Sequence, residues 1–270
     1  MRRLGWAQIP FWFTYVFLYV PVLVLVVMSF NESPLPFKWT GFSTRWYGEL
    51  FQNEEVLAGL LNTLIVAFGS TILSVILGTL LAIGVHRHVR NRFLDALSLG
   101  PAIAPDIIMA IGLLALYSTI GLTLGLHSVL LSHVVFGSAF VAAVVKARLN
   151  HMDPSLEEAS EDLGATKVET FFRITIPGLM PGIVAGALLA FTLSLDEFVI
   201  AFFTNGPATP TLPIVIYSMV RFGVTPELNA LAAILLLITF TVVLSAQRLT
   251  RLGAVSYTHL RAHETNDLIA

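Results

Sequence analysis

Three carboxylates lie within long apolar stretches of this sequence. Asp196 and Glu197 stand together in LSLDEF, and Asp106 stands in APDIIMA, close to Pro101 and Pro105. A carboxylate in apolar surroundings is costly unless it is paired or faces water, so such residues are candidates for function. Asp196 and Glu197 either attract a positively charged solute into a water-filled path or pair with a neighbouring segment or subunit. For Asp106, a local pair near the cytoplasmic end of its segment is the structural alternative.

The composition identifies the class of protein that must position these acids. The 270 residues are 56% hydrophobic and 12% charged, and none is cysteine. An ordinary soluble domain is about 25% charged, so this chain is an integral membrane protein in contact with the lipid bilayer. The absence of cysteine excludes disulfides and cysteine metal sites. The net charge of −2 gives no indication of nucleic-acid binding.

Six segments are long and apolar enough to cross a bilayer core of about 30 Å as helices. Their approximate limits are 10–30, 60–85, 97–118, 127–149, 182–204 and 228–247. The sequence therefore predicts an all-α polytopic membrane protein, with one transmembrane domain over residues 1–255. The prolines beside Asp106 are expected to kink the third span. The polar tail, residues 256–270, is either a disordered extension or foreign sequence, and we assign it no function.

The distribution of Lys and Arg predicts the orientation. With the N-terminus in the cytoplasm, the inner segments hold eleven basic residues: Arg2, Arg3, Arg87, Arg90, Arg92, Lys146, Arg148, Lys167, Arg173, Arg248 and Arg251. The outer segments hold three: Lys38, Arg45 and Arg221. This positive-inside bias places the N-terminus inside, and six spans return the C-terminus to the same side.

Two segments carry small residues at every fourth position. Ser70, Ser74, Gly78 and Ala82 share one face of the second span, and Gly182, Gly186 and Ala190 share one face of the fifth. Because lipid is as apolar as the helices themselves, membrane helices associate through close backbone approach at such residues. The two rows predict packing seams. The outer loop after the first span, which contains GFSTRWYGELF, is expected to form a short helix.

A compact charged block, residues 157–177, interrupts the apolar sequence between the fourth and fifth spans. A first short helix is expected to begin at Asp153–Pro154 or at Ser155, with Glu158 in capping-box position. Gly164 is placed to end that helix.

A second short helix is expected from Thr166, with Glu169 forming another capping box. Such a helix–turn–helix is either a solvated connector or a docking element for a soluble partner.

The residues of this block resemble the EAA loop, which marks the membrane subunits of bacterial ABC importers. The matching residues are Glu158, Ala159, Ser160, Gly164, Ile174, Ile176 and Pro177. Ser160 departs from the consensus, in which the third residue is Ala, but it is also small. The six-span plan extends the resemblance across roughly residues 10–252.

The resemblance implies a type I ABC importer permease fold with six transmembrane helices and both termini in the cytoplasm. In that family the loop contains a coupling helix that sits in a cleft of a cytoplasmic ABC ATPase dimer. It further implies a second permease subunit, a periplasmic solute-binding protein and the bacterial inner membrane. No GxxxxGKS or GxxxxGKT motif occurs in this chain, so ATP and Mg are expected on the partner ATPase. We expect no catalytic or metal-binding residues here.

The sequence around Asp196 narrows the resemblance to a subfamily. FTLSLDEFVIAFF and the following TLPIVIYSMVRFG resemble the PotC-like permeases of spermidine/putrescine importers. That resemblance implies a polyamine path with Asp196, Glu197, Asp106 and Tyr217 as candidate residues, in which carboxylates meet ammonium groups and aromatic rings contribute cation–π contacts. ABC import of another cationic or organic solute, a proton-coupled secondary transporter and a membrane-embedded enzyme are the alternatives.

Overall fold

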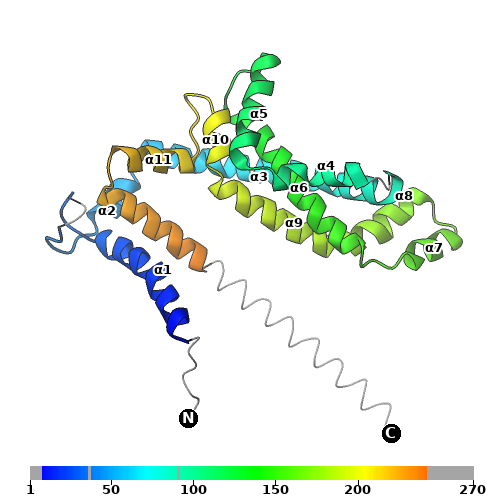
Figure 1. Cartoon of the computed structure of the whole chain (residues 1–270), viewed down its shortest axis with the longest axis horizontal. Coiled ribbons are helices and arrows are strands. Elements are labelled where there is room, and N and C mark those ends of the chain that lie inside the picture. The colour runs from blue at the N-terminus through cyan, green and yellow to red at the C-terminus, as the bar shows by residue number, and fades with distance from the viewer. Residues whose placement is uncertain (1–7, 36–37, 90–91, 242–270) are drawn as a thin grey trace, which may run out of the picture. The chain divides into compact units, whose positions relative to one another are not determined.

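The computed structural model describes residues 8–35, 38–89 and 92–241 (Figure 1). Within these residues the regular elements are helices, apart from one isolated bridge between Asn31 and Phe42. The expected all-α class is confirmed. The tail at 256–270 and the end of the sixth expected span lie outside the described residues. The chain divides into two compact units, residues 1–53 with 219–270, and residues 54–218.

The first unit contains α1 (Gln8–Met28), α2 (Arg45–Leu50) and a helix over Pro226–Thr241. The expected short helix in the outer loop is therefore confirmed as α2. The loop before it is folded around Asn31, whose side chain is fully buried. The Asn31 Nδ2 donates to the carbonyl of Lys38 at 2.8 Å, and the carbonyl of Asn31 accepts from Trp46 Nε1 at 2.7 Å.

The second unit holds the remaining helices, two of which continue into short π-helical turns. Its elements are α3 (Glu54–Gly84), η1 (Val85–Val89), α4 (Arg92–Ile103), α5 (Asp106–Thr119), α6 (Leu126–Leu149), α7 (Ser155–Asp162), α8 (Lys167–Thr170), η2 (Phe171–Thr175), α9 (Ile176–Asp196), α10 (Val199–Thr204) and the first part of α11 (Leu212–Phe222).

Helix α6 packs against both α3 and α9, which also contact each other (Figure 1). A Cβ atom on Gly78 of α3 would lie 2.6 Å from the carbonyl oxygen of Ser138 and 2.8 Å from Cβ of Val141, both on α6. A Cβ on Gly186 of α9 would lie 3.3 Å from Cα of Val141. Both rows of small residues are buried, so the predicted packing seams are confirmed.

A buried polar cluster joins the same three helices. His133 of α6 is 2% exposed, and its Nδ1 lies 2.7 Å from the hydroxyl of Ser194 on α9. Ser194 in turn lies 3.2 Å from the hydroxyl of Ser70 on α3. Our sequence analysis did not single out His133. The available signal was Ser194, which continues the row of small residues on α9 by one further step of four.

The third expected span, 97–118, is not one continuous helix. Helices α4 and α5 are bent by 106° at a break that contains Pro105. Proline has no N–H to donate and disfavours a helical conformation in the residue before it, here Ala104. The expected kink is confirmed, and it is large enough to separate two helices.

The fifth expected span, 182–204, is wrong at both ends. The helical run begins at Lys167 and ends at Asp196, and α10 is a separate helix. At the start, the π-turn η2 precedes Pro177, and its wider backbone makes room for the proline ring inside a continuing helix. At the end, Glu197 adopts an extended backbone with ψ 107°.

Four helices in the described residues are long and apolar enough to cross a membrane: Gln8–Met28, Glu54–Arg87, Leu126–Leu149 and Lys167–Asp196. The bent pair α4 and α5 makes a fifth if it is counted as one span. The helix over Pro226–Thr241 is apolar but shorter, and the rest of the sixth expected span lies beyond it.

The close approach at Gly78 makes a testable prediction. Replacing Gly78 with Ala forces α3 away from α6 and is expected to destabilise the fold by about 1–3 kcal/mol, the usual cost of overpacking. Thermal unfolding of the full-length protein in detergent measures this. Gly112→Ala in α5 is the matched control, since its Cβ meets nothing within 4 Å. Equal melting temperatures for the two variants would contradict the packing argument.

Candidate functional site

The charged loop, which we define as residues 153–177, folds as α7, a tight turn and α8. Gly164 has φ +90°, a left-handed conformation that side chains other than glycine rarely adopt. Its N–H donates to the carbonyl of Glu161 at 2.9 Å, and the N–H of Ala165 donates to the carbonyl of Ser160 at 3.1 Å. The expected role of Gly164 in ending the first helix is confirmed.

The start of α7 differs from the expected capping box. Ser155 is already the first helical residue, so it does not cap, and Pro154 occupies the N-cap position. The carboxylate of Asp153 accepts the backbone N–H of Ser155 at 3.0 Å instead. This backbone hydrogen bond holds the pKa of Asp153 below its usual value. Glu158 therefore has no capping role.

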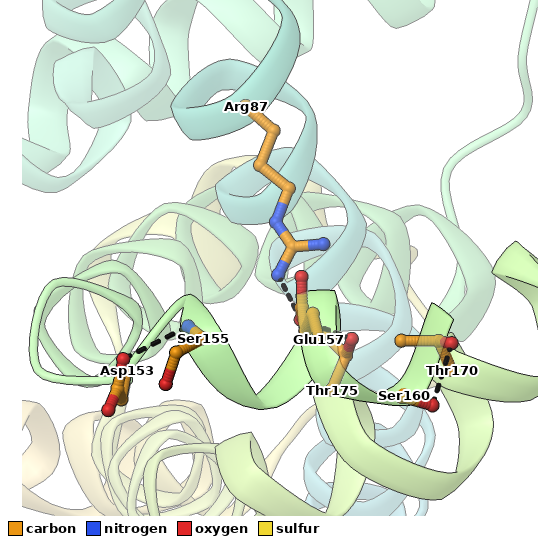
Figure 2. Close-up of polar contacts among 7 residues, drawn as sticks. All are labelled: Arg87, Asp153, Ser155, Glu157, Ser160, Thr170 and Thr175. Atoms are coloured by element: carbon orange, nitrogen blue, oxygen red, sulfur yellow. Dashed lines mark hydrogen bonds and ion pairs between the residues drawn. The ribbon is translucent and has the colours of Figure 1, made fainter. Parts of the chain in front are cut away.

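The start of α8 is the capping box that the sequence predicts. The hydroxyl oxygen of Thr166 accepts the N–H of Glu169 at 3.3 Å, and the Glu169 carboxylate accepts the N–H of Thr166 at 2.9 Å. Ser160 also has a defined contact, since its hydroxyl lies 3.0 Å from that of Thr170 and joins α7 to η2 and α8 (Figure 2).

Glu157, rather than Glu158, connects the charged loop to the rest of the second unit. Its Oε1 accepts a hydrogen bond from Nη2 of Arg87 at 2.6 Å and another from the hydroxyl of Thr175 (Figure 2). Glu158, by contrast, is exposed. Sequence reasoning missed Glu157 because its partners lie 70 and 18 residues away, beyond any local pattern.

The outer surface of the charged loop is partly apolar. Leu163 is 90% exposed, and other apolar side chains of the loop are exposed with it: Leu156, Ala159, Val168 and Phe172. Pro177, another residue matched to the EAA pattern, is exposed in the first turn of α9. Several exposed apolar side chains within one short loop are typical of a surface that another protein covers. The loop can therefore serve as a docking element.

The structure brings the three candidate carboxylates together at two helix breaks. Asp106 is the first residue of α5, Asp196 is the last residue of α9, and Glu197 lies between α9 and α10. Because α5 packs against α10, Asp106 lies in the same region as Glu197, which directly follows Asp196 in the chain.

The carboxylates have no cationic partner among the described residues. In the part of the chain that the structure describes, no Lys or Arg forms an ion pair with Asp106, Asp196 or Glu197. One oxygen of Glu197 instead accepts the backbone N–H of Ile200 at 2.8 Å. Asp106 and Asp196 are exposed within this chain, and Glu197 is half-buried. The arrangement is suited to attracting a cation.

An aromatic cluster adjoins these acids. The ring of Tyr217 on α11 lies 4.9 Å from that of Phe198 and 5.7 Å from that of Phe202, measured between centroids. Phe198 directly follows Glu197 in the chain, and Tyr217 is 42% exposed. The structure thus brings all four candidate path residues to the region around the α9–α10 break. Phe198 and Phe202 complete the cluster.

Comparisons of this chain with known proteins agree on one family. The family described as "Binding-protein-dependent transport system inner membrane component" matches residues 87–252. The chain is 42% identical to the putrescine transport system permease protein PotI of Escherichia coli K12, over 87% of this chain and 86% of PotI. It is 39% identical to the spermidine/putrescine transport system permease protein PotC of the same strain, over 88% of this chain and 90% of PotC.

A solved structure has the same fold. The chain resembles a subunit of a bacterial ABC transporter involved in the import of the acidic polysaccharide alginate, with a TM-score of 0.67 at 14% identity, over 90% of this chain and 94% of that subunit. At this identity the likeness concerns the fold alone. Together with the family match and the two relatives, it leads to one conclusion: the chain belongs to the family of binding-protein-dependent transport system inner membrane components, the permease subunits of ABC importers.

Proposed function

We propose that this chain is a permease subunit that imports polyamines, putrescine or spermidine, across the bacterial inner membrane. The observation that carries the proposal is the group of three carboxylates at two adjacent helix breaks, next to an aromatic cluster. Discontinuous helices commonly form the substrate sites of transporters. The relatives named as putrescine and spermidine/putrescine permeases support the same solute class.

The chemistry of a polyamine matches this site. A polyamine carries several ammonium groups joined by methylene segments. Asp106, Asp196 and Glu197 supply negative charge for the ammonium groups, while the rings of Phe198, Phe202 and Tyr217 offer apolar contact for the methylenes and cation–π contact for the charges. An acidic or neutral solute would bring no positive charge to these carboxylates, and a carboxylate without a counter-charge is costly inside a membrane.

The complete importer contains further subunits in this proposal. The charged loop, through Glu158, Ala159, Ser160, Gly164 and Pro177, docks on a cytoplasmic ABC ATPase dimer that binds ATP and Mg. A second permease subunit completes the path, and a periplasmic binding protein delivers the solute. Six spans with both termini in the cytoplasm are the arrangement that agrees with the positive-inside bias. Closure of the ATPase dimer then drives alternating access.

The carboxylates should determine uptake. Neutralising two of them with Asp196→Asn plus Glu197→Gln is expected to lower spermidine uptake at least about tenfold, because each charged hydrogen bond contributes about 1.5–3 kcal/mol. Labelled spermidine uptake is measured in cells that lack their own polyamine importers and express the whole system. Retention of the ATPase on the purified complex establishes assembly.

The control replaces two exposed acids of the outer loop, Glu32→Gln plus Glu49→Gln, which leaves uptake unchanged. An assembled wild-type complex that takes up neither spermidine nor putrescine would refute the polyamine assignment but not the family. If the Asp196→Asn plus Glu197→Gln variant took up spermidine at the wild-type rate, the proposed role of the carboxylates as a cation site would be refuted.

The turn at Gly164 should determine coupling. Gly164→Val is expected to reduce substrate-stimulated ATP hydrolysis about fivefold or more, because a left-handed backbone costs a β-branched residue about 1–2 kcal/mol. Gly164→Asn, of similar size, is expected to retain most activity, because Asn tolerates this conformation. Substrate-stimulated ATP hydrolysis of the purified complex is the measurement. Equal loss in both variants would show that the space at residue 164, and not its backbone conformation, matters.

A further inference from the structure

The side chain of Glu157 connects three segments that are distant in sequence. Arg87 lies in η1, the π-turn that continues α3. Glu157 lies in the first turn of α7, and Thr175 ends η2, the π-turn from which α9 continues. One atom, Oε1 of Glu157, accepts from both partners, with Nη2 of Arg87 at 2.6 Å (Figure 2). We call these three residues the Glu157 joint.

The joint is partly sheltered from solvent. The side chains of Arg87 and Glu157 are 30% and 21% exposed, and Thr175 is 1% exposed. A cleft of about 260 Å³ borders it, lined by Arg87, Glu157, His86, Leu149, Met152, Asp153 and Pro154. The other ion pair in the described residues, Arg45 with Glu49, is 54% and 48% exposed and joins neighbours on one helix. Exposed ion pairs of that kind contribute little to stability, so the Arg87–Glu157 pair is expected to contribute more than the Arg45–Glu49 pair.

Both partners of Glu157 lie in π-helical turns. Such turns are uncommon inside helices and often occur at functional sites. The joint therefore attaches α7 to the π-turn that follows α3 and to the π-turn that precedes α9. At its far end α9 carries Asp196, so a displacement of α7 applied at Thr175 reaches a candidate substrate residue along one helix.

We propose that the Glu157 joint transmits movement of α7 to α3 and α9, with Glu157 as the positioning residue that holds the three segments together. The proposal rests on the proposed function, in which the charged loop docks on an ATPase. It assigns different roles to two adjacent acids. Glu158 is exposed and belongs to the loop proposed to dock on the partner, whereas Glu157 binds Arg87 and Thr175 of this chain.

The test uses the whole complex in proteoliposomes and measures uptake per ATP hydrolysed. Glu157→Gln and Arg87→Gln are each expected to keep the ATPase bound and hydrolysing while uptake per ATP falls at least about fivefold, the lower end of typical coupling between sites. The double variant is expected to be no worse than either single variant, since both remove the same contact. The charge swap Arg87→Glu with Glu157→Arg restores part of the coupling.

Two further variants separate the joint from general stability. Thr175→Val keeps the shape of the side chain but removes the donor to Glu157, and it is expected to lower uptake per ATP where Thr175→Ser does not. Glu49→Gln breaks the exposed pair with Arg45 and leaves uptake per ATP unchanged. The proposal would be overturned if Glu157→Gln kept the wild-type uptake per ATP. It would also be overturned if the losses of Glu157→Gln and Arg87→Gln added up in the variant that carries both.

A second readout does not depend on the solute. The chain has no cysteine, so spin labels are attached through Glu161→Cys on α7 and Leu188→Cys on α9. With an intact joint, the distribution of distances between the two labels is expected to stay narrow and unchanged when a non-hydrolysable ATP analogue binds the ATPase. Glu157→Gln is expected to broaden this distribution. Equal broadening with and without Glu157 refutes the joint, whereas absent polyamine uptake by the wild type refutes only the proposed solute.

Discussion

The close approach of α3 and α9 to α6 is the constraint on which the second unit depends. In a bilayer, burial of apolar side chains does not drive helices together, so stability comes from packing and interhelical hydrogen bonds. Gly78 and Gly186 both meet α6 at Val141, where a Cβ atom would clash at Gly78 and would be tightly crowded at Gly186. At this separation His133 reaches Ser194, and Ser194 reaches Ser70. The three helices form the frame that carries the acids at one place and the charged loop at another.

The acids lie where the helices are interrupted. A broken helix leaves backbone N–H and carbonyl groups unpaired, which a membrane protein tolerates only where protein or water satisfies them. Glu197 fulfils part of this requirement, since its carboxylate accepts the N–H of Ile200. At the other break, Pro105 has no N–H to satisfy. Each break thus places a carboxylate beside an interrupted helical backbone, and the packing of α5 on α10 brings the two breaks into one region.

Two adjacent residues of α7, Glu157 and Glu158, face in different directions. Consecutive side chains of a helix point about 100° apart, so one of a pair can face inward while the other faces out. Glu157 contacts Arg87 and Thr175, and Glu158 lies exposed beside apolar residues such as Leu163. The loop is therefore anchored to its own chain and open to a partner at once. A rigid attachment and an accessible surface are both needed if docking is to move the helices.

Local and solvent-related features were determined by the sequence alone. The membrane class, the rows of small residues that contain Gly78 and Gly186, the turn at Gly164 and the Thr166–Glu169 capping box depend on composition or on residues within four positions of each other, so a linear pattern records them. The proximity of Asp106 to Glu197, the attachment of Glu157 to Arg87 and the end of α9 at Asp196 were decided by the tertiary structure. Those partners come from separate helices, and only the packing of the helices in three dimensions determines which side chains meet.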